Sequence, residues 1–355
     1  MVPRLLRALL GAAAAGYSPV VRLSNFFYSK GLFKAHCVNL PVFCVGNITV
    51  GGTGKTPLVV WLYKRIISSS KFGISGSECA ILTRGYKAAQ NSGTETQDFR
   101  DEIAILAESC PGAKVVVNPD RVVGAAQAIG NFGARVLIMD DGFQHRRFAR
   151  DLDIVAIDAT RPFGYGRLFP AGLLREPVAS LKRAGAVVIT RCDQVGESEL
   201  HDLERKLLAV NPSMVIARST HSPVCAKTAN GEEVALEQLQ GKKIFAFCGI
   251  GNPEAFLRTV ENLGCELVGS GIYNDHYHYT QRCLDEIYEQ AARLRADLIL
   301  TTQKDWTKIA PLVSPGRDLR LAYLAIEIEF LAGEDKLTAL IEETLAGTIS
   351  KTVDD

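Results

Sequence analysis

The stretch Val45-Gly46-Asn47-Ile48-Thr49-Val50-Gly51-Gly52-Thr53-Gly54-Lys55-Thr56-Pro57 decides the fold class of this 355-residue chain. It joins a β-rich run to an amphipathic segment, Leu58 to Ile67, through a turn that is dense in glycine. A strand, a glycine loop and a helix N-terminus together hold phosphate, because backbone N–H groups converge on the anion and the helix dipole adds positive potential. The residues predicted to bind the phosphates of a nucleotide are Thr49, Val50, Gly51, Gly52, Thr53, Gly54, Lys55 and Thr56.

Within this loop, Lys55 supplies a positive charge and Thr56 a hydroxyl ligand for Mg²⁺. The strict pattern has glycine five residues before Gly54, where this chain has Thr49. The alternative is an ordinary glycine turn, but the order of strand, loop and helix favours phosphate binding. The loop therefore predicts a nucleoside triphosphate and leaves the acceptor open.

The composition indicates a globular chain with well-filled cores, since 47% of the residues are hydrophobic and 22% are charged. Its length favours two domains. The nine cysteines are scattered without a Cys-x-x-Cys pair, which argues against a zinc site or a disulfide framework. We expect buried thiols in a reducing compartment.

The charges are distributed unevenly along the chain. Residues 1–77 carry nine Lys and Arg and no acid, whereas the remainder has a net charge of −8. The leader, Met1 to His36, resembles a signal peptide or an organellar transit peptide in part. Its apolar run, Ala8 to Gly16, is too short to span a bilayer as a helix. We favour an interfacial helix that lies on an anionic membrane surface, with a packing helix as the alternative.

Apolar runs alternate with amphipathic segments after the loop. This order predicts a mostly parallel sheet covered on both faces, with ligands beyond the carboxyl ends of the strands. The expected strands are Cys79–Thr83, Lys114–Val117, Arg135–Met139, Ile154–Ile157, Ala186–Ile189, Met214–Ala217, Lys243–Cys248, Glu266–Val268, Leu298–Thr301 and Leu321–Ile328. The expected helices are Leu58–Ile67, Asp101–Ala107, Arg121–Ala128, Glu197–Leu208, Ala255–Leu263 and Thr280–Arg295.

We expect two α/β/α sandwich domains, the larger one a mostly parallel sheet of the P-loop NTPase type. The pattern weakens into a polar stretch after residue 220, where Asn230-Gly231 signals a turn. The predicted organisation is an amphipathic membrane-interface helix at 1–35, a nucleotide-binding domain at 36–220, a linker at 221–240, a smaller α/β domain at 241–345 and a tail at 346–355.

Two adjacent carboxylates, Asp140 and Asp141, close a strongly apolar run. An acid at a strand end beside a phosphate loop commonly binds Mg²⁺ directly or through water. Because adjacent residues point to opposite sides of a strand, one faces the metal and the other meets the acceptor or orients a basic group. The sequence leaves open which of them contacts Mg²⁺, and a polar strand end that caps a turn is the alternative.

Other polar clusters are candidates for the same site. Tyr86 follows a strand, and Asp101 opens a helix, where an acid is favourable for the dipole in any case. A loop at 164–177, dense in Gly, Pro and Arg, can bind an anion or supply a carboxylate through Glu176. Asp275 and His276 are adjacent, so the acid can orient the imidazole, or the histidine can complete an acid–base pair with another carboxylate. The alternative is a structural turn, which the spacing of these two residues does not distinguish from a catalytic pair.

Over roughly residues 20–310 the chain resembles the tetraacyldisaccharide 4′-kinase (lipid A 4′-kinase) family, because many of the family's motifs occur in it in the same order. Besides the phosphate loop, the resemblance rests on Tyr28-Ser29-Lys30-Gly31-Leu32, Thr83-Arg84-Gly85-Tyr86, Asn118-Pro119-Asp120-Arg121, Asp140-Asp141-Gly142-Phe143-Gln144-His145, Gly166-Arg167-Leu168, Pro170-Ala171-Gly172, Leu174-Arg175-Glu176-Pro177, Cys248-Gly249-Ile250-Gly251-Asn252-Pro253, Asp275-His276 and Thr301-Thr302-Gln303-Lys304-Asp305. The family also lacks the first glycine of the loop, which accounts for Thr49.

The resemblance implies transfer of the γ-phosphoryl group of ATP, with Mg²⁺, to the 4′-hydroxyl of a tetraacylated glucosamine disaccharide 1-phosphate in lipopolysaccharide synthesis. It implies Asp101 as the general base with His276 as its partner. The catalytic residues are then Asp101, His276, Lys55 and Asp141, and the metal ligands are Thr56, Asp140 and Glu176. The residues expected to bind the acceptor are Asn47, Tyr86, Arg121, Asp141, Gln144, Arg175 and Asp275.

The expected partners are the lipid A disaccharide precursor and the cytoplasmic leaflet of a Gram-negative inner membrane, where the protein would be peripheral. We expect neither nucleic acid nor an obligate protein partner. The main alternative is a GTP-hydrolysing metallochaperone or targeting switch, because Thr190-Arg191-Cys192-Asp193 loosely resembles the base-reading motif of GTPases. A non-catalytic membrane scaffold is a third.

Overall fold

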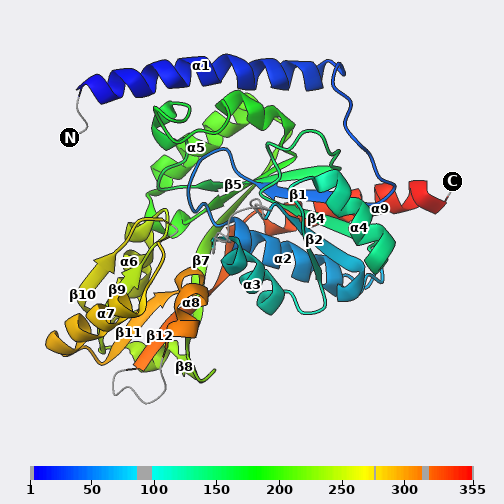
Figure 1. The fold of residues 1–355 in the computed structure, drawn as a ribbon. Coiled ribbons are helices and arrows are strands. Elements are labelled where there is room, and N and C mark those ends of the chain that lie inside the picture. The colour runs from blue at the N-terminus through cyan, green and yellow to red at the C-terminus, as the bar shows by residue number, and fades with distance from the viewer. Residues whose placement is uncertain (1–3, 86–97, 276, 314–319, 354–355) are drawn as a thin grey trace, which may run out of the picture. The chain divides into compact units, whose positions relative to one another are not determined.

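The computed structural model describes residues 4–85, 98–275, 277–313 and 320–353. They fall into two compact units (Figure 1). The first unit comprises Met1–Gly85, Cys110–Thr220 and Glu329–Asp355, and the second comprises Tyr86–Ser109 and His221–Ile328.

The first unit is built on a parallel sheet. Its strands are β1 (Val42–Gly46), β2 (Cys79–Thr83), β3 (Lys114–Val117), β4 (Val136–Asp140), β5 (Leu152–Asp158), β6 (Ala186–Thr190) and the first part of β7 (Val215–Thr228). Their order across the sheet is β7-β6-β5-β1-β4-β2-β3, with every neighbouring pair parallel. All five residues of β1, β2, β4 and β6 are buried, as expected of central strands in a sheet covered on both faces.

The helices of the first unit are α1 (Arg4–Ser29), α2 (Lys55–Ser68), α4 (Arg121–Phe132), α5 (Glu197–Val210) and α9 (Glu334–Val353). Local signals set the ends of α4: the Asp120 side chain accepts from the Val122 N–H, and Gly133 ends the helix in the left-handed region at φ 63°. Apolar side chains of α2, among them Leu58 and Leu62, are fully buried. Packing of such apolar faces, more than intrinsic propensity, stabilises helices of this length.

The second unit contains parallel strands in the order β10-β9-β11-β12. Its strands are β9 (Lys243–Cys248), β10 (Glu266–Ile272), β11 (Leu298–Thr302), β12 (Arg320–Ala332) and the short β8 (Glu233–Ala235), which pairs antiparallel with the second half of β7. Its helices are α3 (Asp98–Ser109), α6 (Pro253–Asn262), α7 (Gln281–Arg293) and α8 (Gln303–Ile309).

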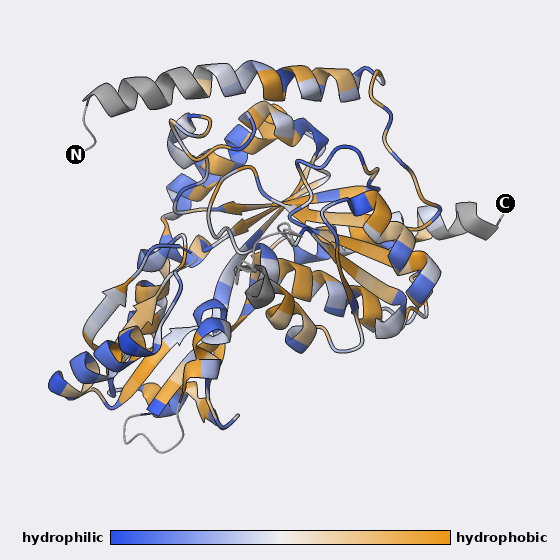
Figure 2. Ribbon diagram, viewed as in Figure 1, coloured by the Kyte–Doolittle hydropathy of each residue, from blue (hydrophilic) through white to orange (hydrophobic). Residues whose placement is uncertain are grey.

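Alternate residues of β9 enter two different hydrophobic clusters in the second unit. Ile244 and Ala246 pack in a cluster with residues of α6, whereas Phe245 and Phe247 pack in a cluster with residues of α7. Because successive side chains point to opposite faces of a strand, α6 and α7 cover opposite faces of this sheet. Figure 2 shows many of the strands in the hydrophobic colours, whereas the helices carry hydrophobic and hydrophilic colours side by side.

The predicted fold class, a mostly parallel α/β arrangement, is confirmed. The polar stretch at 221–240, expected as a linker, contains instead the second half of β7, β8 and a 3-10 turn at Leu236–Leu239. Cys225 and Ala226 of β7 are buried, but the polar residues around them give the stretch little apolar pattern. Gly231 does make the expected turn, at φ 76°. Residues 346–353, expected as a tail, continue α9.

The leader forms one long helix, α1, which ends at Ser29 and includes Pro19. The membrane-interface assignment of residues 1–35 stays a prediction. Within the described part of the chain, no helix combines the length and the apolar character that crossing a bilayer requires.

Candidate active site

The glycine loop lies in the first unit, where β1 ends and α2 begins. Gly51 and Gly54 have φ angles of 115° and 84°, conformations that favour glycine. Gly54 precedes the first residue of α2, Lys55, and no side chain among the described residues caps the helix there. The first N–H groups of α2 are therefore available to an anion.

Bonds from three segments hold the loop in place. Buried Asn47 donates from Nδ2 to Thr53 Oγ1 at 3.0 Å, and Thr190 Oγ1, from the end of β6, donates to the Thr53 carbonyl at 3.0 Å. Thr49 forms an antiparallel bridge with Leu174. Extended backbone suits a β-branched residue, so the position where the strict motif has glycine needs none here.

Asp141 joins the loop to the end of β4. Its carboxylate lies 3.5 Å from Lys55 Nζ and accepts from Arg175 Nη1 at 2.8 Å and 3.0 Å. Burial alone would raise the pKa of Asp141, but the charges of Lys55 and Arg175 outweigh it and the pKa is lowered. Asp141 also has a φ of 50°, an uncommon conformation for a non-glycine residue, of the kind that clusters at functional sites.

Asp140, the preceding residue, is 3% exposed, and its backbone carbonyl accepts from Arg121 Nη2 at 3.0 Å. Arg121, itself 3% exposed, also donates to the Asn118 carbonyl, and its Nε is buried without a partner among the described residues. The two adjacent carboxylates therefore differ in surroundings: Asp141 pairs with Lys55, whereas the backbone of Asp140 anchors a buried guanidinium.

Gln144 and Asn47 are also brought together. Gln144 Nε2 donates to the Asn47 carbonyl at 2.8 Å, and Asn47 Oδ1 is buried without a partner among the described residues. An unpartnered buried oxygen beside the loop is an acceptor that a bound ligand or water would satisfy.

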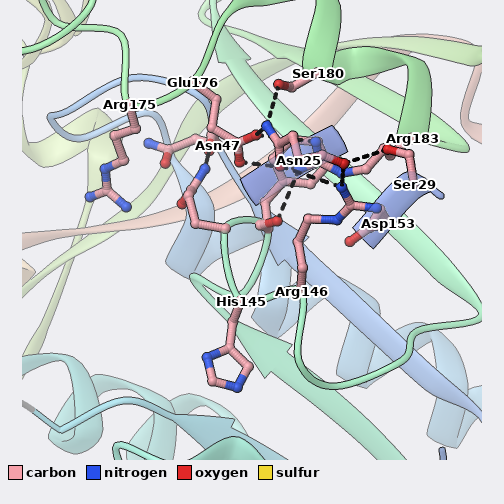
Figure 3. Close-up of polar contacts among 12 residues, drawn as sticks. Asn25, Ser29, Asn47, His145, Arg146, Asp153, Arg175, Glu176, Ser180 and Arg183 are labelled. Atoms are coloured by element: carbon pink, nitrogen blue, oxygen red, sulfur yellow. Dashed lines mark hydrogen bonds and ion pairs between the residues drawn. The ribbon is translucent and has the colours of Figure 1, made fainter. Parts of the chain in front are cut away.

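The contacts of Glu176 differ from those expected of the predicted metal ligand. Its carboxylate accepts from Arg183 Nη1 and Nη2, both at 3.1 Å, and from Asn25 Nδ2 of α1 at 2.8 Å. Figure 3 shows the side chains of Arg175 and Glu176, neighbours in sequence, directed to different sides. Glu176 therefore ties α1 to the rest of the first unit, a role that the sequence did not reveal because Asn25 and Arg183 carry no motif.

A buried ion pair joins the ends of two neighbouring strands, β5 and β6. Arg191, directly after β6, donates to Asp158 at the end of β5, and both side chains are less than a tenth exposed. Asp193 accepts a hydrogen bond from Thr220 Oγ1. The segment that loosely resembles a base reader is thus held by contacts within the protein.

The remaining predicted site residues belong to the second unit or lie outside the described residues. Asp101 lies in the first half of α3, which packs against α8. Asp275 pairs with Lys304 of α8 at 3.1 Å. The predictions for Tyr86 and His276 fall outside the described residues. Their roles, like that of Asp101, stay predictions.

Comparison with known proteins decides the family. The profile of the tetraacyldisaccharide-1-P 4′-kinase family matches residues 6–346. The chain belongs to this family. It is a kinase of lipid A biosynthesis, and the GTP-hydrolysing alternative is set aside.

Curated tetraacyldisaccharide 4′-kinases align with the chain over most of its length. The protein of Anaeromyxobacter sp. strain Fw109-5 is 37% identical, over 95% of this chain and 88% of its own, and that of Syntrophus aciditrophicus is 39% identical, over 90% and 88%. The crystal structure of the "apo" form of LpxK from Aquifex aeolicus in complex with ATP has a TM-score of 0.71 and 28% identity, covering 96% of this chain and 99% of its own. The fold is therefore that of the tetraacyldisaccharide 4′-kinases.

Proposed function

We propose that this kinase uses ATP and Mg²⁺ to phosphorylate the 4′-hydroxyl of a tetraacylated glucosamine disaccharide 1-phosphate at the cytoplasmic face of a Gram-negative inner membrane. The observation that carries the proposal is the position of Lys55. It opens α2 directly after the glycine loop and lies 3.5 Å from Asp141. A lysine at this place in a phosphate loop reaches the terminal phosphates of a bound nucleotide.

The loop fits a triphosphate. A Cβ built on Gly51 or Gly52 would meet nothing within 4 Å, so space is open beside the backbone at both positions. The uncapped first turn of α2 offers N–H donors on the same loop. An ATP complex of a family member with the same fold agrees with this assignment.

The donor set also fits Mg²⁺, which prefers hard oxygen ligands and keeps several waters. Thr56, in the first turn of α2, and Asp140, at the end of β4, would hold the ion. When bound, Mg²⁺ neutralises charge on the transferring phosphoryl group. Glu176 does not share this role in our proposal, since both of its carboxylate oxygens are occupied by Arg183.

Residues of the chain would carry the remaining steps. Lys55 stabilises the negative charge of the phosphoryl oxygens. Arg175 holds Asp141 in a fixed orientation, and both face the loop. We propose that Asp101, paired with His276, accepts the proton of the attacking sugar hydroxyl, which is a poor nucleophile without a base.

The acceptor would contact polar residues around the loop and at the strand ends. We propose Asn47, Gln144, Arg121 and Arg175 of the first unit for this role, with Tyr86 and Asp275. The unpartnered Oδ1 of Asn47 supports it, because a sugar hydroxyl could donate to this oxygen.

The chemistry of α1 supports a peripheral position on a membrane. Val20, Leu23 and Phe26 are each more than half exposed, and the exposed Arg22 and Lys30 lie among them. Exposed apolar side chains interleaved with basic ones are typical of helices that lie at an anionic interface.

The test is acceptor-dependent release of ADP by the full chain in detergent. We expect turnover with ATP and Mg²⁺ that requires the lipid disaccharide, and little with GTP. Thr56→Val should raise the Mg²⁺ concentration needed for half-maximal rate, whereas Thr160→Val, a matched change outside the loop, should not. Nucleotide hydrolysis that ignores the acceptor would refute the proposal.

A further inference from the structure

A cavity of about 550 Å³ lies in the first unit, at the C-terminal end of α1. It is lined by Tyr28 and by the segment after α1, including Phe33 and Lys34, on one side. Arg146, Arg150, Asp153 and Arg183 line the other side. The volume lies in the range of small-molecule sites. None of the residues predicted for ATP, Mg²⁺, catalysis or the acceptor lines this cavity.

The charges in this cavity do not cancel. Arg150 forms a two-bond pair with Asp153, at 3.1 Å and 3.0 Å, and Arg183 is paired in the same way with Glu176. Neither Arg146 nor Lys34 has a carboxylate within ion-pair distance among the described residues. Two carboxylates, those of Asp153 and of the Glu176 bound to Arg183, thus face four basic side chains in the wall of the cavity, which leaves an excess of two positive charges.

Arg146 is fixed in position. Its Nη1 donates to the backbone carbonyl of Asn25 at 2.7 Å (Figure 3). Its guanidinium lies 5.2 Å from the centroid of the Tyr28 ring. Burial lowers the pKa of Arg146, the nearby charges of Arg183 and Arg150 lower it further, and the more weakly acting carboxylates of Glu176 and Asp153 offset only part of this effect. A guanidinium has five N–H donors, and the hydrogen bonds of the Arg146 side chain to described residues both start from Nη1, so Nε and Nη2 can donate to a ligand. An anion in the cavity would relieve the repulsion among these arginines.

The opposite wall is also held in place. His36 donates its N–H to the Arg147 carbonyl at 2.8 Å, and Ala149 donates to the His36 carbonyl at 2.8 Å. This bridge fixes the segment that carries Lys34 against the protein. Arginine and lysine side chains at a cavity are donors by which proteins recognise phosphate.

Exposed apolar residues in the same part of the chain indicate the kind of molecule that carries the anion. Phe33, which lines the cavity, is 47% exposed, and Leu32, its neighbour in sequence, is 65% exposed. Phe26 on α1 is 51% exposed. Apolar side chains near a cationic cavity match a ligand that has acyl chains beside a phosphate.

We propose that this cavity binds a phosphate group carried by a lipid, with Arg146 and Lys34 as its main contacts. Two lipids offer this chemistry: an anionic phospholipid of the membrane, and the acceptor disaccharide through its own 1-phosphate. The cavity proposal depends on the proposed function in one respect: it assumes that the molecule that carries the phosphate is a lipid.

The first arm of the test measures binding to phosphatidylcholine vesicles that contain either phosphatidylglycerol or cholesteryl hemisuccinate, at equal surface charge. Phosphatidylglycerol has a phosphate and the hemisuccinate only a carboxylate. If the source is the phospholipid, the full chain should prefer phosphatidylglycerol by about tenfold, the size of a charge-assisted hydrogen bond. The double variant Lys34→Gln, Arg146→Gln should lose that preference.

The matched control is Arg22→Gln, Lys30→Gln, which removes the same charge from α1 and its end but from outside the cavity. It should weaken binding to both kinds of anionic vesicle and keep the preference. Arg146 also bonds to α1, so its replacement disturbs the helix as well as the cavity. The second variant is therefore Lys34→Gln alone. Lys34 is exposed, so the fold should survive, and part of the preference should be lost.

The second arm compares KM in detergent for the acceptor with and without its 1-phosphate. If the acceptor is the source, the double variant should raise KM about tenfold for the phosphorylated acceptor only, with kcat unchanged. Normal kinase activity with no phosphate preference in either arm would overturn the cavity proposal alone. Absence of kinase activity would refute the proposed function, while the vesicle arm would still report on the cavity.

Discussion

Replacing Glu176 by glutamine separates the two roles considered for this residue, anchor of α1 and ligand of Mg²⁺. The carboxylate is 4% exposed, its partner Arg183 is 18% exposed, and two hydrogen bonds of 3.1 Å join them. Breaking a buried ion pair by removing one partner costs about 3–5 kcal/mol. Since Arg183 keeps some contact with water, we expect the lower end, about 3 kcal/mol, and a fall in Tm of roughly 6–12 °C.

The pH dependence gives a second check on the same residue. Burial alone would raise the pKa of Glu176, but Arg183 and hydrogen bonds from Arg183, Asn25 and Ser180 outweigh it, so the pKa is lowered. A carboxylate with a lowered pKa stabilises the fold above its unfolded pKa, about 4.3. The advantage of the wild type over Glu176→Gln should therefore be complete at neutral pH and shrink as the pH falls below that value.

The assay is urea unfolding followed by circular dichroism, combined with a Mg²⁺ titration of the kinase rate. Glu197→Gln is the matched control, because Glu197 pairs with Arg218 but is 71% exposed and should change stability by less than about 1 kcal/mol. An unchanged unfolding midpoint in Glu176→Gln, together with a raised Mg²⁺ requirement, would refute the anchor role and restore the metal role.

Three further changes have expected outcomes. Lys55→Ala should lower kcat about 10²–10³-fold with little change in Tm, because Asp141 keeps Arg175; a rate within tenfold of wild type would contradict the role of Lys55. Asp101→Ala should cut turnover by orders of magnitude while ATP binding, measured by calorimetry, stays nearly intact, and a wild-type-like rate would remove Asp101 as the base. Gly46→Ala should destabilise the fold by about 1–3 kcal/mol, because its Cβ would lie 2.6 Å from Phe143 Cβ. Gly130→Ala in α4, where a Cβ meets nothing within 4 Å, is the control and should not be destabilising in the same unfolding assay.

Most strands and several helices could be predicted from the sequence because their signal is local. The helix α9 was not predicted, and its last residues were expected to form a tail. The expected ranges for β2, β3 and β9 match the structure, since these strands are compact apolar runs bounded by polar or glycine residues. The short helix α8 could not be predicted, because seven residues give too little amphipathic pattern. The second half of β7 was missed for a similar reason. It mixes buried Cys225 and Ala226 with polar residues in no regular alternation, and its pairing with β8 depends on residues beyond the turn.

The site was predictable where a motif fixes the backbone. The loop from Thr49 to Thr56, and the placing of Asp141 beside it, follow from the order of strand, glycine and helix. The setting of Glu176 was not predictable, because its partner Asn25 lies 151 residues away and the two meet only in the folded chain. A sequence pattern shows that a carboxylate is present, but long-range contacts decide what it binds.

The most direct test of the account is transfer of label from γ-labelled ATP to a tetraacylated glucosamine disaccharide 1-phosphate in detergent, with Mg²⁺ and the purified full chain. The account predicts labelled lipid with the new phosphate at the 4′ position, and at least about a hundredfold slower formation with Lys55→Ala. Folded protein that binds ATP but yields no labelled lipid would contradict it.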